Sequence, residues 1–510
     1  MESLLLFSKI TLSSLYIFIL VVLCILGLNR YYLFYIQNKF KNKKNRPLKY
    51  YSRLPRVTVQ LPIYNEMYVA KRLIDAVCKL DYPSDLLEIQ VLDDSTDNTS
   101  VIAENAVKSH SSEGVNIQYL HRDNRAGFKA GALENGLKYS RGELIVIFDA
   151  DFIPPADFLT KTVDYFTDEN VGIVQTRWGH INKNYCSLTK AQSILLDGHF
   201  VVEQFARSNG GYYINFNGTA GILRKSCIKD AGGWQHDTLT EDLDLSYRAQ
   251  MKGWRAVYLN DVVVDAELPV EINSFKSQQH RWAKGGIQTA AKLLPSLLSN
   301  KNIQTRVKIQ SLFHLLGNIS YPLLLMLIIL MIPLAYLWSS VGWEKVIMFN
   351  LLAITAGTLS VFNFYFTAVR SVYGSNWLGF ARYIPLSIAL GSGLAINNTK
   401  AVFEALFKRD TDFNRTPKFA VTKNSDTYFK KNYTTSRNFT SLIELLLGIA
   451  LMIKTVYAAY LGFYGWIPFL LIIQFGFFYT SLLSYFHNNI NIFDTVKPTI
   501  LKKLTLLRSK

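Results

Sequence analysis

The sequence predicts an α/β domain with a mostly parallel sheet, joined to an α-helical transmembrane domain. Three observations lead to this fold class. Short β-rich runs alternate with helical patterns between Arg56 and about Asn300, long runs without a charged residue stand on both sides of that segment, and basic blocks flank those runs. Of the 510 residues, 49% are apolar and 18% are charged, which excludes an intrinsically disordered, collagen-like or disulfide-knotted chain.

The excess of positive charge is concentrated beside the apolar runs. The formal net charge is +17, and residues 30–56 hold nine Lys or Arg and no acidic residue. A second block, residues 400–437, holds nine Lys or Arg against four acidic residues. Basic residues beside spans indicate orientation in a membrane, with these blocks in the cytosol. We therefore expect a membrane lipid bilayer, and not nucleic acid, as the partner of this charge.

The N-terminal element, residues 1–30, is predicted to be a transmembrane anchor. Ile10 to Asn29 lacks charged residues and meets the ~20 apolar residues that a helix needs to span a bilayer. A signal peptide is the alternative. We favour a retained anchor because the basic residues follow the run and no small-residue cleavage site ends it.

Residues 54–300 are predicted to form the α/β domain, which ends in an amphipathic helix at the membrane interface (Ile287 to Leu298). The expected strands end in polar or acidic residues. Carboxyl ends of parallel strands meet at one edge, where ligands bind in such sheets. The expected strands are Val57–Ile63, Glu88–Asp94, Leu144–Asp149 and Gly172–Trp178. The polar side chains expected at that edge are Asn65, Asp93, Asp94, Asp149 and Asp151.

The remaining third of the chain is predicted to be largely transmembrane. We expect two spans in residues 309–370, two more in 440–487, and a basic cytosolic tail at 488–510. Residues 377–438 are assigned to an interfacial helix and a cytosolic loop. A span there would place the second basic block outside and break the positive-inside rule. With the N-terminal anchor this makes a multi-pass protein whose α/β domain faces the cytosol.

A pair of acidic residues follows the third expected strand, in the motif FDAD. Asp149 and Asp151 provide the hard oxygen ligands that Mg²⁺ or Mn²⁺ prefers, and such an ion can also be shared with the phosphates of a nucleotide. The alternative is an acidic turn that caps the helix after Pro154 and Pro155.

Asp242 lies in the motif TED, at the predicted start of a helix. There its carboxylate can accept a proton from an attacking hydroxyl as a general base. The alternative is an acid that is favoured at this position only by the helix dipole.

Two further groups are candidates for binding phosphate or sugar. Gln278, Arg281 and Trp282 in QQHRW share one helical face and offer an amide, a guanidinium fork and a flat aromatic surface. Arg and Trp packed at the membrane surface are the alternative. Lys129 stands in a basic, glycine-bearing segment that can approach phosphate, or else begins an ordinary solvated helix.

The order of these motifs resembles the processive family 2 glycosyltransferases: the synthases of cellulose, mannan, chitin and hyaluronan. The resemblance covers about Leu54 to Lys430 and is closest to the cellulose synthase-like glucomannan synthase branch. It rests on RDNRAGFKAGAL, LDGHFVVEQ, FNGTAGILR, AGGW, TLTEDLDLSYRAQMKGW and QQHRWAKGG. It implies a GT-A fold for the cytosolic domain.

Residue by residue, the resemblance implies the following roles. Asp93 or Asp94 holds the nucleoside, and Asp149 and Asp151 bind the diphosphate with its Mg²⁺ or Mn²⁺. Asp242 is the base, and Gln278, Arg281 and Trp282 line the acceptor end and the diphosphate. Phe419 to Lys423 (FAVTK) is similar to a gating loop of cellulose synthases, although the lysine comes one position early.

The function that this implies is an inverting hexosyltransferase that polymerises a β-linked glucan, mannan or glucomannan and translocates it across the membrane. The alternative is a single transfer to a membrane lipid. The donor, UDP-glucose or GDP-mannose, stays open, as do an accessory export subunit and the choice between a bacterial inner membrane and a Golgi-type membrane. A catalytically silent scaffold is disfavoured by the complete set of base, metal and phosphate residues.

Overall fold

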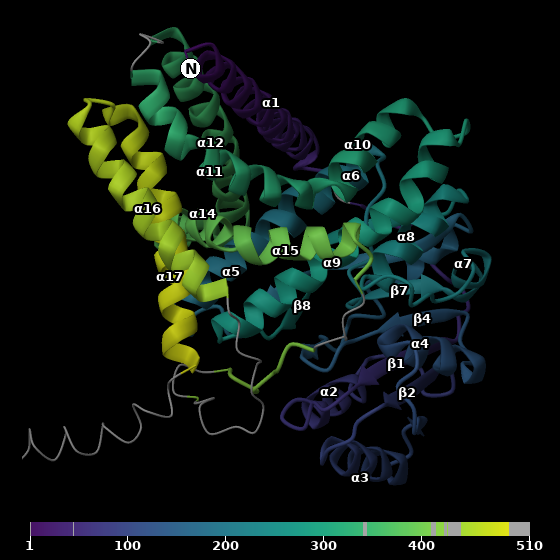
Figure 1. Ribbon diagram of the computed structural model, residues 1–510. Coiled ribbons are helices and arrows are strands. Elements are labelled where there is room, and N and C mark those ends of the chain that lie inside the picture. The colour runs from purple at the N-terminus through teal and green to yellow at the C-terminus, as the bar shows by residue number, and fades with distance from the viewer. Residues whose placement is uncertain are drawn as a thin grey trace, which may run out of the picture.

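The computed structural model describes residues 2–43, 45–339, 344–409, 415–422, 426 and 440–488. A sheet domain and a set of long apolar helices lie on opposite sides of two helices that run between them (Figure 1). The two intervening helices are α9 (Ile272–Ser299) and α15 (Ala395–Leu406), which pack against each other. The sheet domain, which carries the motif residues, therefore contacts the apolar helices through α9 and α15.

The sheet has eight strands in the order β3-β2-β1-β4-β7-β6-β8-β5. Pairs among β1 to β4 are parallel, β6 pairs in parallel with β8, and β7 and β5 pair antiparallel with their neighbours. The α/β fold class with a mostly parallel sheet is confirmed. The strands are β1 (Val57–Ile63), β2 (Leu87–Asp93), β3 (Ile117–His121), β4 (Leu144–Ile147), β5 (Phe152–Ile153), β6 (Val171–His180), β7 (Gly221–Arg224) and β8 (Arg255–Ala266).

The half of the sheet beyond β4 is mixed, which differs from a sheet of parallel strands alone. β7 is four residues long, too short for a periodic pattern, and β8 carries polar residues along a partly exposed strand. Neither signal is visible in a local window of sequence. Of the buried strands, β4 (LIVI) is a continuous apolar run, whereas β1 (VTVQLPI) and β2 (LEIQVLD) alternate apolar with polar residues.

The helices of the sheet domain cover the two faces of the sheet and bury two apolar clusters against it. Between α5 and α6 the chain forms one stretch of π-helix, η2 (Gly198–Gln204). The helices are α2 (Ala70–Val77), α3 (Thr99–Ser112), α4 (Phe128–Tyr139), α5 (Ser187–Asp197), α6 (Phe205–Gly210), α7 (Lys225–Asp230) and α8 (Glu241–Met251), with a short 3₁₀ turn, η1 (Val163–Thr167).

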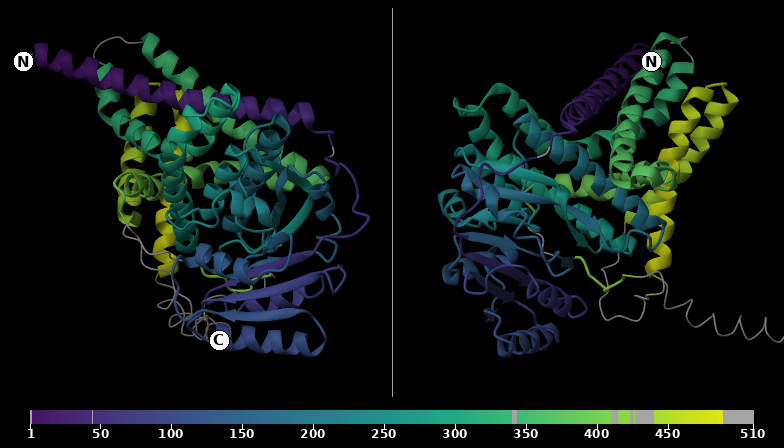
Figure 2. Two further views of the ribbon diagram at one scale, coloured as in Figure 1. Left: turned by 90° about the vertical axis from the view of Figure 1, so that its right-hand side faces the viewer. Right: turned by 180° about the vertical axis from the view of Figure 1, so that it is seen from behind.

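The first helix, α1 (Glu2–Phe40), continues ten residues beyond residue 30, where the predicted anchor ends. Leu33 and Ile36 on its C-terminal part are buried against Tyr212 and Tyr247 of the sheet domain. Burial of this apolar stripe stabilises the extra turns although the segment is basic. Figure 2 shows the N-terminal part of α1 projecting away from the sheet.

By length and composition, three helical segments in the described part of the chain can cross a membrane: Ile10–Phe40, Thr440–Tyr460 and Tyr464–His487. A fourth is counted if Thr305–Leu315 and Gly317–Met331, which meet at a 46° bend, are one span. The five-span topology stays a prediction.

The remaining elements are α10 (Thr305–Leu315), η3 (Gly317–Ile319), α11 (Ser320–Ser339), α12 (Glu344–Tyr373), η4 (Gly374–Asn376), α13 (Trp377–Ala381), α14 (Ile384–Gly393), α16 (Thr440–Tyr460), η5 (Tyr464–Trp466) and α17 (Ile467–Asn488).

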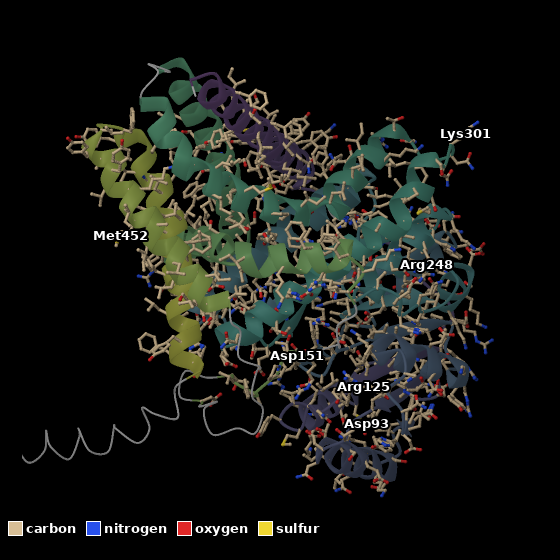
Figure 3. The ribbon with its side chains drawn as sticks, viewed as in Figure 1. Asp93, Arg125, Asp151, Arg248, Lys301 and Met452 are labelled. Atoms are coloured by element: carbon tan, nitrogen blue, oxygen red, sulfur yellow. The ribbon has the colours of Figure 1, made fainter. Side chains whose placement is uncertain are left out.

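The segment assigned to an interfacial helix is divided into three short helices, α13, α14 and α15. The apolar α14 packs against α17 and α5, whereas α15 runs along α9. On α15, Phe403 and Leu406 are exposed, as is Phe407 directly after it. In Figure 3, Met452 marks the outward face of α16, far from Asp151 in the sheet domain.

Candidate active site

A cavity of about 180 Å³ lies at the carboxyl ends of β1, β2 and β4. That edge is where ligands bind in open α/β sheets. The cavity brings together residues from the sheet edge, from the start of α8 and from α9. The predicted site residues that line it are Asp94, Lys129, Asp149, Asp151, Asp242, Gln278, Arg281 and Trp282.

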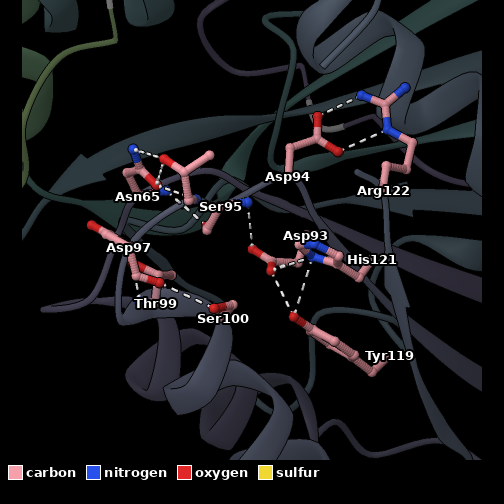
Figure 4. A network of polar contacts seen from close by, with 11 residues as sticks. Asn65, Asp93, Asp94, Ser95, Asp97, Thr99, Ser100, Tyr119, His121 and Arg122 are labelled. Atoms are coloured by element: carbon pink, nitrogen blue, oxygen red, sulfur yellow. Dashed lines mark hydrogen bonds and ion pairs between the residues drawn. The ribbon is translucent and has the colours of Figure 1, made fainter. Parts of the chain in front are cut away.

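Asp93 does not line the cavity, although its neighbour does. Its carboxylate is fully buried and accepts hydrogen bonds from Tyr119 Oη (2.7 Å) and the backbone N–H of Ser95 (3.1 Å), with His121 Nδ1 3.0 Å away. Asp94 faces the cavity and is held by both nitrogens of an Arg122 fork, at 2.7 and 2.5 Å (Figure 4). Asp93 thus orders the strand end and Asp94 is presented to a ligand.

Each carboxylate of the FDAD motif faces an ammonium group. Lys129 Nζ lies 2.5 Å from Asp149 Oδ1 and also donates to the Gly218 carbonyl at 3.0 Å. Lys418 Nζ lies 2.6 Å from Asp151 Oδ2. Burial raises the pKa of Asp149, although the Lys129 charge acts in the opposite direction. Each carboxylate of the motif is therefore paired with a lysine inside the cavity.

The two carboxylates fit a divalent ion that is shared with a ligand. They provide hard oxygen donors in the same cavity. Among the residues that the structure describes, no three His, Cys, Asp or Glu side chains gather as a complete metal site. The protein would thus supply two carboxylates, and the other positions would be filled by water and by ligand oxygens.

Asp242 occupies the first turn of α8 and faces the same cavity. Its Oδ1 accepts a hydrogen bond from the Leu243 N–H at 2.8 Å. Burial, and next the adjacent Glu241 charge, raise the pKa of Asp242 to about 7. Gly218 (φ +80°) passes so close that a Cβ there would lie 2.8 Å from Asp242 Oδ2. A carboxylate poised near neutral pH suits a general base.

The residues of QQHRW lie on α9, which closes the cavity from the side of the membrane helices. Trp282 lies 6.5 Å from Trp178, centroid to centroid, so that two aromatic rings border the cavity. Gly285 of the same helix packs on the TED segment: a Cβ there would lie 2.6 to 2.9 Å from atoms of Thr240. This close approach couples the position of α9 to that of Asp242.

Several cavity residues were missed from the sequence. Arg415 NH1 lies 3.1 Å from Glu66 Oε2, and the Arg125 guanidinium stacks 3.4 Å from the centroid of the Tyr64 ring. Burial raises the pKa of Glu66 to about 8 despite the Arg415 charge. PIYNE, next to the first strand, was the available signal for Tyr64 and Glu66. Arg415 and Lys418 lie just before FAVTK, in a segment that is far in the sequence from the other residues of the cavity.

The FAVTK segment is described only up to Thr422, and Lys423 lies outside the described residues. The Phe419 N–H donates to Glu267 Oε1 at 2.9 Å, and Phe419 and Val421 are buried against Val270. The part of this segment that contacts the cavity is thus Arg415 to Lys418, which lies directly before the motif. Whether FAVTK closes over a nucleotide stays a prediction.

Residues 55–285 match the family described as "Glycosyltransferase like family 2". Glucomannan 4-beta-mannosyltransferase 2 of Arabidopsis thaliana is 44% identical over 267 residues, which are 51% of this chain and 50% of the relative. A probable glucomannan 4-beta-mannosyltransferase 11 of Oryza sativa subsp. japonica is 46% identical over 254 residues, 49% of this chain and 45% of the relative. The chain spans about half the length of the curated relatives it matches.

A solved structure has the same fold. It is a mannosyltransferase from Pyrobaculum calidifontis in complex with GDP-Man and Mn²⁺, with a TM-score of 0.55 and 20% sequence identity. The match covers 78% of this chain and all of that one. The GT-A fold expected from the motifs is confirmed for the sheet domain.

Proposed function

We propose that this chain, a member of glycosyltransferase family 2 through residues 55–285, transfers a hexose from a nucleotide sugar to the growing end of a β-linked glycan. The observation that carries the proposal is the single cavity at the sheet edge. It unites a base with a raised pKa, a pair of carboxylates and a cationic and aromatic wall. A binding protein needs no base at this position.

We infer that the hexose is mannose and the donor GDP-mannose. The glucomannan 4-beta-mannosyltransferases are 44% and 46% identical to this chain over 267 and 254 residues, about half of its length. A protein of the same fold is solved with GDP-Man and Mn²⁺. UDP-glucose is the competing donor, because the two donors differ only in the base and in one hydroxyl configuration of the hexose.

The reaction proceeds with inversion at the anomeric carbon. Asp242 accepts the proton of the attacking acceptor hydroxyl, whose oxygen forms the new bond to that carbon. The bond from the carbon to the diphosphate oxygen breaks, and the nucleoside diphosphate leaves with the electron pair. Arg281 and Lys129, which line the same cavity, stabilise the charge that develops on the leaving group.

The remaining residues bind and orient the two substrates. Asp94, fixed by Arg122, and the Arg125–Tyr64 stack are on the side that receives the nucleoside. Trp282 and Trp178 provide flat apolar surfaces for the sugar rings of the acceptor. Asp149 and Asp151 would hold Mg²⁺ or Mn²⁺, which would supply positive charge to the donor diphosphate.

The same proposal includes embedding in the membrane and export of the product. Trp282 stands on α9, the helix that separates the sheet domain from the apolar helices (Figure 1). A glycan that grows past Trp282 therefore leaves toward the membrane side. The catalytic domain remains in the cytosol, since the basic blocks beside the spans orient it there.

The test is to incubate the purified full chain with Mg²⁺ or Mn²⁺ and, separately, labelled GDP-mannose and UDP-glucose, and to size the product. We expect label from GDP-mannose in an ethanol-insoluble polymer that a β-mannanase degrades. Asp242→Asn should reduce the rate about 10²- to 10⁴-fold while the protein still binds GDP, because only the base is lost.

Three results would contradict parts of the proposal. Label confined to a short product that organic solvent extracts would make the chain a glycolipid transferase. Polymer from UDP-glucose alone would replace the donor. Full activity in Asp242→Asn would remove Asp242 as the base.

A further inference from the structure

A second cavity, of about 290 Å³, lies between α1, α11, α12, α14 and α17. We call it the membrane-helix cavity. No residue lines both it and the cavity of the active site. Its volume is just below the ~300–1,000 Å³ range of small-molecule pockets, so it can admit part of one lipid chain but not a whole lipid.

The wall of the membrane-helix cavity is mainly aliphatic. A hydrated sugar chain needs hydrogen-bonding partners along its path, whereas an acyl chain needs only apolar contact. The chemistry of this wall therefore matches an acyl chain. Representative lining residues are Leu23, Leu324, Leu327, Ile354, Leu470 and Ile473.

One cation, Arg30, lines the same cavity. It lies near Tyr321 and Tyr365, which also line the cavity. Among the residues that the structure describes, no carboxylate lies within 4.0 Å of the Arg30 guanidinium. The nearby Glu203 instead pairs with Arg207 at 2.9 Å and with His199 at 3.2 Å. Arg30 thus brings a positive charge to the cavity that no acidic side chain neutralises.

Arg30 also stands at one end of an uncharged run, which is the depth of lipid phosphates if that run spans a bilayer. It is the first charged residue after the uncharged run from Ile10 to Asn29, and the basic block that faces the cytosol begins with it. Basic pockets between transmembrane helices on the cytosolic side bind anionic head groups. Depth, charge and the apolar wall thus agree on a single kind of ligand.

We propose that the membrane-helix cavity binds an anionic phospholipid, with one acyl chain between the helices and the phosphate on Arg30. Two glycines on facing helices, Gly357 of α12 and Gly391 of α14, leave room for the chain: a Cβ at either would meet no atom within 4 Å. The lipid then acts as a wedge between α1, α12 and α14. This inference does not depend on the proposed transferase activity.

The test places the full chain in phosphatidylcholine nanodiscs that contain a photo-crosslinkable phosphatidylglycerol, and counts crosslinked lipid per protein by mass spectrometry. We expect Arg30→Gln to reduce crosslinking about tenfold, the loss of one charge-assisted contact. Arg30→Lys should retain most of it. Arg370→Gln is the matched control, because Arg370 is an exposed cation at the end of α12 that does not line the cavity.

Filling the cavity tests the acyl chain separately. Gly357→Leu and Gly391→Leu should each abolish crosslinking, whereas Gly317→Leu should leave it unchanged, since Gly317 also has free space but lies outside the cavity. Equal crosslinking in Arg30→Gln and wild type would overturn the proposal, as would competition by inorganic phosphate, which would indicate a site for the free anion. Shortened glycan with unchanged lipid crosslinking in Gly357→Leu would make the cavity a glycan path and overturn it too.

Discussion

In the sheet domain, charged side chains of both signs gather around one cavity, whereas Lys276 and Lys454, buried among the helices on the membrane side, lie outside that cavity. Asp149, Asp151 and Asp242 share the active-site cavity with Lys129 and Lys418. On the other side, Lys276 of α9 pairs with Glu444 of α16 at 2.7 Å with both side chains fully buried. Lys454, inside α16, donates to the Met331 carbonyl.

The difference reflects what the charges do. Burial raises the pKa of Asp149 and Asp242 and costs stability, which a protein tolerates where the charges act on a ligand. The buried charges of Lys276 and Glu444 line neither cavity and instead satisfy each other. We therefore expect substitutions in the first region to change rates, and substitutions in the second region to change stability.

The largest effect on stability is expected from breaking the buried pair of Lys276 and Glu444. Lys276→Met leaves Glu444 charged and unpaired and should lower the free energy of unfolding by about 3–5 kcal/mol. The double variant Lys276→Met/Glu444→Met should recover most of the loss. The apparent Tm in detergent measures both. A double variant as unstable as the single one would mean that the pair itself is not what the helices require.

A smaller effect, on rate and position, is expected at the contact between α9 and the TED segment. Gly285→Ala brings a Cβ within 2.9 Å of the Thr240 backbone nitrogen, so α9 must shift, at a cost of about 1–3 kcal/mol. We expect a lower kcat, because Gln278, Arg281 and Trp282 move with the helix.

Gly286→Ala is the control for this substitution. Its Cβ would meet only the Asn318 side chain, at 3.0 Å, which can move aside. If both variants keep the wild-type kcat, the spacing between α9 and the TED segment does not set the geometry of the site.

A shift in pH dependence should follow from the charge next to Asp242. The base works only when it is deprotonated, so kcat/KM should rise with pH through about 7. Glu241→Gln removes a negative charge and should lower the pKa of Asp242, which moves this rise to lower pH. Because the pKa of Asp242 is raised in the folded protein, its contribution to stability is present at low pH and is lost as pH rises through about 7.

The control for the pH profile is Glu66, a second carboxyl of the cavity, whose pKa burial raises to about 8. Glu66→Gln should leave the midpoint of the rise where it is. If the midpoint moves in Glu66→Gln and not in Glu241→Gln, Glu66 and not Asp242 controls the profile.

The smallest effect is expected from a surface pair in the sheet domain. Lys108 and Glu104 lie 2.8 Å apart on α3, with 68% and 46% of their side chains exposed. Lys108→Ala should change the free energy of unfolding by less than about 0.5 kcal/mol and leave activity unchanged. A larger loss, measured by denaturation, would show that burial of an ion pair does not determine how much its removal lowers the free energy of unfolding.

By itself, the sequence determined the elements whose signal is local. The strands β1, β2 and β4 are rich in β-branched and other apolar residues and are followed by polar residues at the sheet edge. The run Ile10 to Asn29 is long and uncharged, and Thr440–Tyr460 is long and largely apolar. Asp149, Asp151 and Asp242 follow or begin such elements, so their placement in one cavity could be predicted. The spacing of Gln278, Arg281 and Trp282 required only that the segment be helical.

Only the tertiary structure decided between Asp93 and Asp94, because the choice depends on Tyr119, His121 and Arg122 of the neighbouring strand end (Figure 4). It also brought Lys418 to Asp151 and Arg415 to Glu66. The physical reason is the same in each case. Periodicity reports the surroundings of a residue within a few turns or strand positions, whereas these contacts depend on how separate strands and segments pack.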